Sequence, residues 1–191
     1  MKKMDGFAAE MIPIRLVISM VIIAAIMVMV VMGYNYFRVV SAEHQVENEY
    51  RAFESTLYSM IGSGVARDVN EVGAGEGTKR VFTFHLPDTL VYLAFGVDPD
   101  TDNDGVLHTG LTEGGSVVCY RVSNGGKHVF WLPSDQFQFR EGNYTDERWV
   151  IHEDGQGFIL DAGGESTLTF ELVQQNTQVY ILIQGSDSFN P

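Results

Sequence analysis

The sharpest chemical pattern in the sequence is an acidic run over residues 98–105, which reads Asp-Pro-Asp-Thr-Asp-Asn-Asp-Gly. It matches the opening D-x-D-x-D-G of a calcium-binding loop, in which alternate carboxylates turn inward and Gly105 permits a sharp turn. The predicted ligands are four carboxylates and one backbone carbonyl, supplied by Asp98, Asp100, Asp102, Asp104 and Val106. The twelfth loop position, normally a bidentate glutamate, is Leu111, and Glu113 comes two residues late. We predict a structural Ca²⁺ that stiffens an exposed loop; a solvated acidic turn is the alternative, because Asp, Asn and Gly also favour turns.

A second candidate is a modification site. Asn143-Tyr144-Thr145 is an N-x-[ST] sequon on a polar stretch that we expect between two strands. Asn143 is therefore a predicted glycosylation site if this part of the chain lies outside the membrane. The motif is short and chance matches are frequent, so an unmodified asparagine is the alternative.

The other reactive side chains show no spacing typical of catalysis. The five histidines form no H-x-x-x-H or H-E-x-x-H pattern, and no G-x-S-x-G turn accompanies them. The single cysteine, Cys119, excludes an internal disulfide and a cysteine-based zinc site. We therefore predict that the chain is not an enzyme and holds no catalytic cofactor.

The composition indicates two unlike parts. Only 19% of the 191 residues are charged, yet 12 basic residues face 25 acidic ones, for a net charge of −13. The first 33 residues hold three of the basic and two of the acidic residues, so the remainder carries a net charge of −14. Because nucleic-acid affinity comes from Lys and Arg neutralising phosphates, this balance argues against a nucleic-acid partner.

An apolar segment, Leu16–Gly33, contains no charged residue. Its 18 residues lie at the lower limit for crossing a hydrocarbon core of about 30 Å, and extension over residues 12–37 makes it long enough. Three basic residues lie before it or at its start, and only Arg38 closely follows it, which predicts a cytoplasmic N-terminus and an exterior remainder. The segment is too long for a cleavable secretory signal and lacks an Ala-x-Ala site, so we expect it to be retained.

The residues ahead of this segment read Met-Lys-Lys-Met-Asp-Gly-Phe-Ala-Ala-Glu. A short basic leader, then Gly6-Phe7, Glu10 and a retained apolar helix, resembles the class III signal of type IV pilins and archaellins. The resemblance covers about the first 60 residues. It implies that residues 1–6 are a leader, that a dedicated peptidase cuts after Gly6, and that Phe7 becomes the first mature residue. It also implies that Glu10 neutralises a neighbouring subunit's N-terminal amine during assembly, because an isolated ion in dry surroundings is costly.

The helical pattern continues beyond the apolar segment. Apolar residues follow spacings of three and four on one helical face: Val39, Ala42, Val46, Tyr50, Phe53, Leu57 and Met60. Gly62-Ser63-Gly64 is a typical helix end. We predict a transmembrane or assembly helix over residues 7–37 and an amphipathic helix continuing it over 38–63, together about 75 Å long.

From residue 64 the helical period disappears. We predict a Gly-rich connector over residues 64–79 and an exported β domain over 80–191. Nine runs rich in β-branched and aromatic residues are predicted strands, over residues 80–86, 89–96, 116–122, 127–132, 136–140, 148–152, 157–161, 166–173 and 178–184. The predicted fold class is α+β, with a long N-terminal helix and an antiparallel β-sandwich-like domain in the lollipop arrangement of pilins.

Two functions follow as hypotheses. The first is a pilin-like envelope protein of an archaeal cell surface, a structural or minor subunit of a type IV pilus-like filament. Its partners would be membrane lipid, the leader peptidase, and copies of itself or other pilin-like subunits. The second is a permanently anchored, single-pass membrane protein whose extracellular β domain acts as an adhesive or accessory binding module. A plain signal anchor would fit the second hypothesis.

Overall fold

The computed structural model describes the backbone of residues 6–71, 73, 75–108, 115–132, 137–145, 148–152 and 156–185, and the side chains among them from Ile14 onward. The chain divides into two compact units, Met1–Val40 and Ser41–Pro191. This division falls inside the N-terminal helix and not at its end, so the β-rich unit includes a helical segment of its own.

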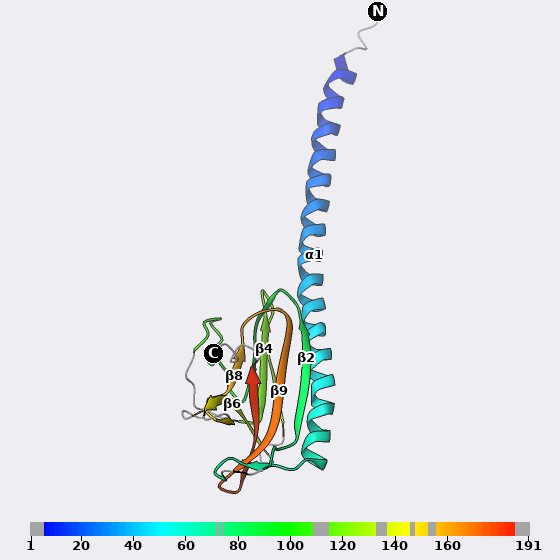
Figure 1. The fold of residues 1–191 in the computed structure, drawn as a ribbon. Coiled ribbons are helices and arrows are strands. Elements are labelled where there is room, and N and C mark those ends of the chain that lie inside the picture. The colour runs from blue at the N-terminus through cyan, green and yellow to red at the C-terminus, as the bar shows by residue number, and fades with distance from the viewer. Residues whose placement is uncertain are drawn as a thin grey trace, which may run out of the picture. The chain divides into compact units, whose positions relative to one another are not determined.

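One helix, α1 (Gly6–Ser63), runs through both units (Figure 1). The hydroxyls of Ser19, Thr56 and Ser63 donate to carbonyls four residues earlier, as from Ser63 to Ser59 at 2.8 Å, so these side chains do not interrupt the helix. In the first unit the described side chains are exposed from Ile14 to Arg38. From Ile14 onward the helix is long and apolar enough to cross a membrane.

The second unit contains two sheets. The strands are β1 (Arg67–Asp68), β2 (Lys79–Leu86), β3 (Leu90–Phe95), β4 (Val117–Val122), β5 (Lys127–Trp131), β6 (Gln138–Thr145), β7 (Arg148–Ile151), β8 (Phe158–Leu160), β9 (Gly164–Gln175) and β10 (Gln178–Gly185). The six-stranded sheet has the order β1-β9-β10-β6-β7, with β2 also paired to β9. The four-stranded sheet has the order β5-β4-β3-β8.

The predicted α+β class is confirmed, and each of the nine predicted strands has a counterpart. The antiparallel prediction is wrong in two places, because β6 runs parallel to β10 and β1 runs parallel to β9. Strand β1 lies inside the expected connector, and β6 continues past its predicted end at residue 140 to Thr145. The extension of β6 follows from its pairing with β7, in which Asn143 lies opposite Val150.

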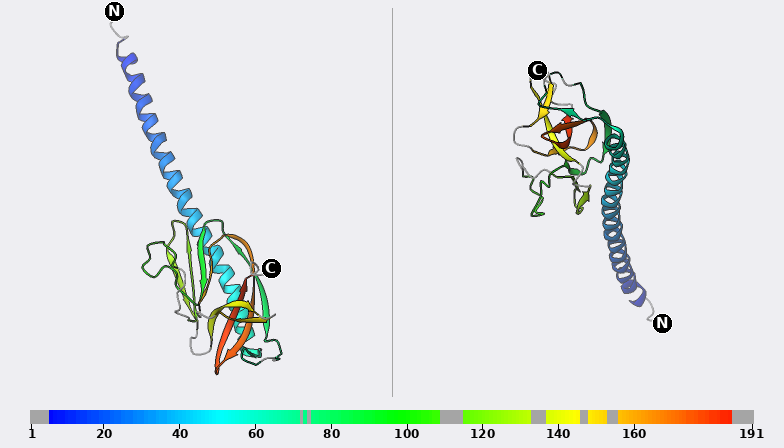
Figure 2. Two further views of the ribbon diagram at one scale, coloured as in Figure 1. Left: turned by 60° about the vertical axis from the view of Figure 1, so that its left-hand side comes forward. Right: turned by 90° about the horizontal axis from the view of Figure 1, so that it is seen from below.

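The core of the second unit forms where the segment of α1 from Ser41 onward packs on the sheets (Figure 2). The buried face is the predicted apolar stripe, Ala42, Val46, Tyr50, Phe53, Leu57 and Met60. Phe53 lies at the centre, with its ring 4.7 Å from that of Phe170 in the six-stranded sheet and 5.6 Å from that of Phe95 in the four-stranded sheet. One helical side chain therefore joins both layers.

Candidate functional site

The acidic run forms a loop between β3 and β4. We call residues 97–107 the acidic loop. Its two ends carry Val97 and Leu107, which pack on Cys119 and its apolar neighbours on the face of the four-stranded sheet that points away from α1. The backbone N–H of His108 donates to the carbonyl of Pro99 at 2.8 Å and ties the two ends together. Apolar burial at both ends thus holds the polar middle of the loop in place.

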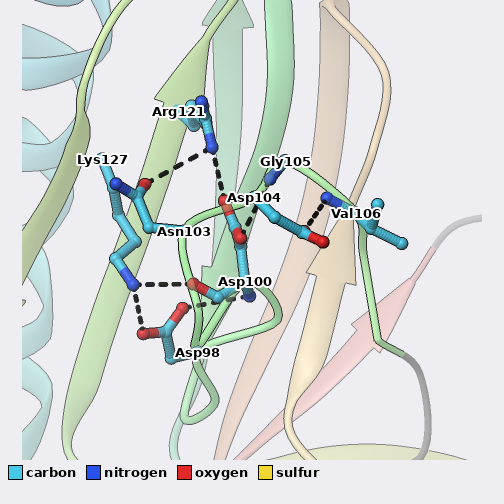
Figure 3. Close-up of polar contacts among 8 residues, drawn as sticks. All are labelled: Asp98, Asp100, Asn103, Asp104, Gly105, Val106, Arg121 and Lys127. Carbon is cyan, nitrogen blue, oxygen red and sulfur yellow. Dashed lines mark hydrogen bonds and ion pairs between the residues drawn. The ribbon is translucent and has the colours of Figure 1, made fainter.

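Asp100 is the buried anchor of the acidic loop, with a fully buried side chain. Its Oδ1 accepts the N–H of Gly105 at 3.1 Å, and its Oδ2 pairs with Nη1 of Arg121 at 2.6 Å (Figure 3). Burial works to raise the pKa of this carboxyl, but the Gly105 hydrogen bond and the Arg121 charge hold that pKa below its ordinary value of 3.8. Asp100 is therefore a charged group satisfied from within the protein.

Asp98 has a cation of its own. The Nζ of Lys127 lies 2.9 Å from Asp98 Oδ2 and also donates to the carbonyl of Asp100 at 2.7 Å. Asp98 Oδ1 accepts the backbone N–H of Asp100 at 3.1 Å (Figure 3). Both cations come from neighbouring strands, since Arg121 on β4 pairs in register with Lys127 on β5.

The remaining loop carboxylates behave differently. Asp102 and Asp104 are exposed, and a carboxylate oxygen of each lies within 4.8 Å of the other and of a ring nitrogen of His108. Asp104 Oδ1 accepts the N–H of Val106 at 2.7 Å, so the backbone N–H of Val106 points toward this carboxylate.

The four predicted calcium-binding carboxylates thus fall into two groups, because Asp98 and Asp100 already have protein cations. Only Asp102 and Asp104 among the four carboxylates have no ion pair within the part of the chain that the structure describes. A calcium ion would therefore have to bind these two carboxylates. His108 lies beside them, but calcium prefers oxygen ligands to a ring nitrogen. Leu111 and Glu113 lie outside the described residues. Calcium at this loop stays a prediction.

Asn143 lies in β6 and not in a loop between strands, which corrects the predicted context of the sequon. Its side chain is exposed, as are those of Tyr144 and Thr145. The position is accessible although it is in a strand, because it lies near the end of the β6–β7 hairpin. Glycosylation of Asn143 stays a prediction.

Sequence reasoning missed a buried ion pair on the six-stranded sheet. Glu171 on β9 is 1% exposed, and its Oε1 lies 2.8 Å from Arg67 Nε on β1. Gly77 donates its backbone N–H to the same Oε1 at 3.1 Å, and Gln184 donates to Oε2 at 3.0 Å. The pair attaches the expected connector to the sheet. An isolated glutamate in the predicted strand 166–173 was the one available signal, because a buried carboxylate needs partners.

The residues that carry the pilin resemblance lie at the start of α1. The helix includes Gly6, Phe7 and Glu10 as backbone. Their side chains, and residues 1–5, lie outside the described residues. In comparison with known proteins, no family model, no curated protein and no solved structure matches the chain.

Proposed function

We propose that the chain is a pilin-like cell-envelope subunit, anchored by the first part of α1 and able to join a type IV pilus-like surface filament after leader removal. The observation that carries the proposal is the continuous helix α1. Its apolar part is exposed in a unit of its own, while the part from Ser41 onward supplies the core stripe of a β-rich unit. An anchor that merely tethered the domain would not need to provide that core.

The length and flanks of the apolar part support membrane insertion. From Ile14 to Gly33 the helix rises about 30 Å, which matches a hydrocarbon core. Tyr34, Tyr36 and Phe37 follow at once and are exposed, and the Arg38 guanidinium lies 5.9 Å from the Tyr34 ring centroid. Aromatic and basic residues are typical of the membrane–water interface. We infer that the N-terminus is cytoplasmic and the β-rich unit extracellular.

Assembly rests on the N-terminal chemistry that the sequence resemblance implies. Cleavage after Gly6 would free the amine of Phe7, and the carboxylate of Glu10 on a neighbouring subunit would neutralise that amine. In an apolar filament core the two charges need each other, because breaking a buried pair costs about 3–5 kcal/mol. Copies of the chain would then pack by their apolar helices.

The proposal is tested by N-terminal sequencing and intact mass of the protein from its native cells. The expected first residue is Phe7. Retention of Met1–Gly6 in filament-bearing cells would contradict the pilin-like function and favour a permanently anchored β domain that acts as a binding module.

A second variant separates insertion from assembly. Glu10→Gln is expected to insert into the membrane as the native chain does and to give few filaments. Ser19→Ala, an uncharged change within the same helix, is the matched control. Normal filaments from Glu10→Gln would remove the assigned role of Glu10 and leave the cleavage result to decide the rest.

A further inference from the structure

Arg140 on β6 is a half-buried cation on the outer face of the six-stranded sheet. Its Nη1 donates to the carbonyl of Phe139 at 2.9 Å, and its Nη2 donates to Oε1 of Gln138 at 2.8 Å. The guanidinium carbon lies 5.4 Å from the ring centroid of Tyr180 on β10. All of these partners are uncharged, and burial lowers the pKa of Arg140 below its ordinary value.

Three other cations of this unit that are buried or half-buried have carboxylate partners. Arg67 pairs with Glu171 at 2.8 Å, Arg121 pairs with Asp100 at 2.6 Å, and Lys127 pairs with Asp98 at 2.9 Å. Arg140 has no carboxylate partner among the residues that the structure describes. In a chain with 25 acidic and 12 basic residues, a partly desolvated cation without a counter-charge is unusual, because desolvating a charge is costly unless it is paired.

The surroundings of Arg140 suit a planar carboxylate. The side chains of Gln138 and Arg140 point to the same face because they are two residues apart on β6, and Tyr180 lies opposite Gln138 in the parallel register. The aromatic ring supports the guanidinium, and the amide of Gln138 orients it. A guanidinium with free N–H groups binds a carboxylate through two parallel hydrogen bonds.

The same chain carries carboxylates that lack such a partner. Asp102 and Asp104 are exposed in the acidic loop, with no ion pair in the described part of the chain. The loop lies on the outer face of the four-stranded sheet, whereas Arg140 lies on the outer face of the six-stranded sheet. The two complementary groups therefore lie on opposite faces of the sandwich and do not meet within one copy.

We propose that Arg140 is a carboxylate-binding site that receives the acidic loop of a second copy of this chain, at Asp102 and Asp104. The contact is heterologous, since one face of each copy meets the opposite face of the next. Such contacts do not close into a two-fold dimer and can extend a row of subunits. The inference rests on the proposed function, for which it supplies a contact between the β-rich units in addition to helix packing.

The test compares self-association of the processed, full-length chain in detergent by sedimentation velocity, with a chelator present, at low and at high salt. Native chain is expected to associate more strongly at low salt, because screening weakens exposed ion pairs. R140E should weaken association by about tenfold or more, since it places like charges together. R140Q removes the charge with a smaller change in shape and should give an intermediate loss.

Charge exchange provides the specific signature. Among the described residues, the side chain of Asp102 makes no hydrogen bond. D102R therefore leaves intact the hydrogen bonds that Asp100 and Asp104 make within the loop. D102R alone should weaken association, and D102R combined with R140E in one chain should restore it. R80E is the matched control, because Arg80 is an exposed cation on β2 whose side chain, among the described residues, donates only to the carbonyl of Lys79. It should associate as the native chain does.

The failures are distinguishable. If the native processed chain does not associate, the proposed function and the contact both fall. If R140E associates as well as native chain and R80E, with an unchanged melting temperature, the contact is wrong and the pilin-like function stands. If R140E leaves association unchanged but abolishes binding of a soluble uronic-acid polymer, the carboxylate partner is a polysaccharide and the second-copy assignment is overturned.

Discussion

The two halves of α1 share one backbone conformation and have opposite surroundings. Residues 14–38 are exposed all round, whereas the half from Ser41 buries a stripe from Ala42 to Met60 against β strands. The first half has no charged residue between Leu16 and Gly33, while the second has acidic and basic residues beside its stripe, such as Glu47 and Arg51, which pair at 2.6 Å. A helix that is apolar on every side needs an apolar solvent, and a helix with one apolar stripe needs a partner. The distribution of apolar residues thus decides what each half contacts.

The largest expected effect is on stability, and it distinguishes the two halves of α1 by how their side chains pack. Phe53→Ala should destabilise the second unit by about 3–5 kcal/mol, because it opens a cavity between both sheets. Ile26→Ala, in the exposed half, should leave that unit unchanged. Urea unfolding of the full chain in detergent, followed by the fluorescence of buried Trp149, measures both. Equal effects of the two substitutions would show that the division at Ser41 is wrong.

A second prediction separates the halves by solvent. Ile23→Asp should disfavour membrane insertion by about 2.5–3.5 kcal/mol, the cost of a charge at the centre of a spanning helix. Ser55→Asp, on an exposed position of the second half, should insert normally. Membrane fractionation and protease protection of the two variants provide the readout. Normal insertion of Ile23→Asp would contradict the assignment of the segment from Ile14 to Gly33 to the hydrocarbon core.

A smaller effect follows from pH. The pKa of Asp100 is below its ordinary value of 3.8, so its contribution to the stability of the second unit is present above about pH 4 and is lost as the pH falls through the lowered pKa. Asp100→Asn should therefore reduce stability at neutral pH and flatten its dependence on acid. Melting curves from pH 6 to about pH 2 measure the slope. If stability falls with pH as steeply in Asp100→Asn as in the native chain, Asp100 is not the source of the acid sensitivity. Membrane insertion should not follow the same pH dependence, because Leu16–Gly33 contains no titratable group.

The smallest expected effect concerns calcium. If the acidic loop binds calcium, a tenfold excess over the dissociation constant stabilises the second unit by about 1.4 kcal/mol. The melting temperature should rise with calcium and fall with chelator, and Asp102→Asn should abolish the difference. Glu76→Gln, an exposed acidic position away from the loop, is the control. An unchanged melting temperature at millimolar calcium would rule out a calcium ion in this loop.

Local pattern predicted the elements well, because each element is encoded by neighbouring residues. The stripe from Ala42 to Met60 and the alternation in residues 166–173 needed no knowledge of distant chain. The parallel pairing of β6 with β10 and of β1 with β9 could not be predicted in this way, because it joins segments far apart in sequence. A two-residue strand such as β1 also has too few residues to show a period.

The chemistry of the acidic loop was predicted in part for the same reason. The run of carboxylates was visible, and its D-x-D-x-D-G spacing suggested a metal cation. The actual partners of Asp98 and Asp100 are Lys127 and Arg121, which a strand register brings beneath the loop. Counting charges along the chain could not find them, since the register of β4 with β5 sets the distance. Arg140 was missed likewise, because the lack of a carboxylate beside it among the described residues depends on its neighbours in space and not in sequence.

The central position of Phe53 has a consequence for biogenesis. The core stripe of α1 comes before every strand in chain order, whereas Ile181 and Ile183, which complete the core, come from the last strand, β10. During synthesis the apolar stripe of the helix therefore stays uncovered until Ile181 and Ile183 have been made. Such non-local closure is slow and leaves intermediates open to aggregation. The yield of folded subunit would then depend more on early shielding of residues 42–60, by a chaperone or by the membrane surface, than on the formation of any single strand.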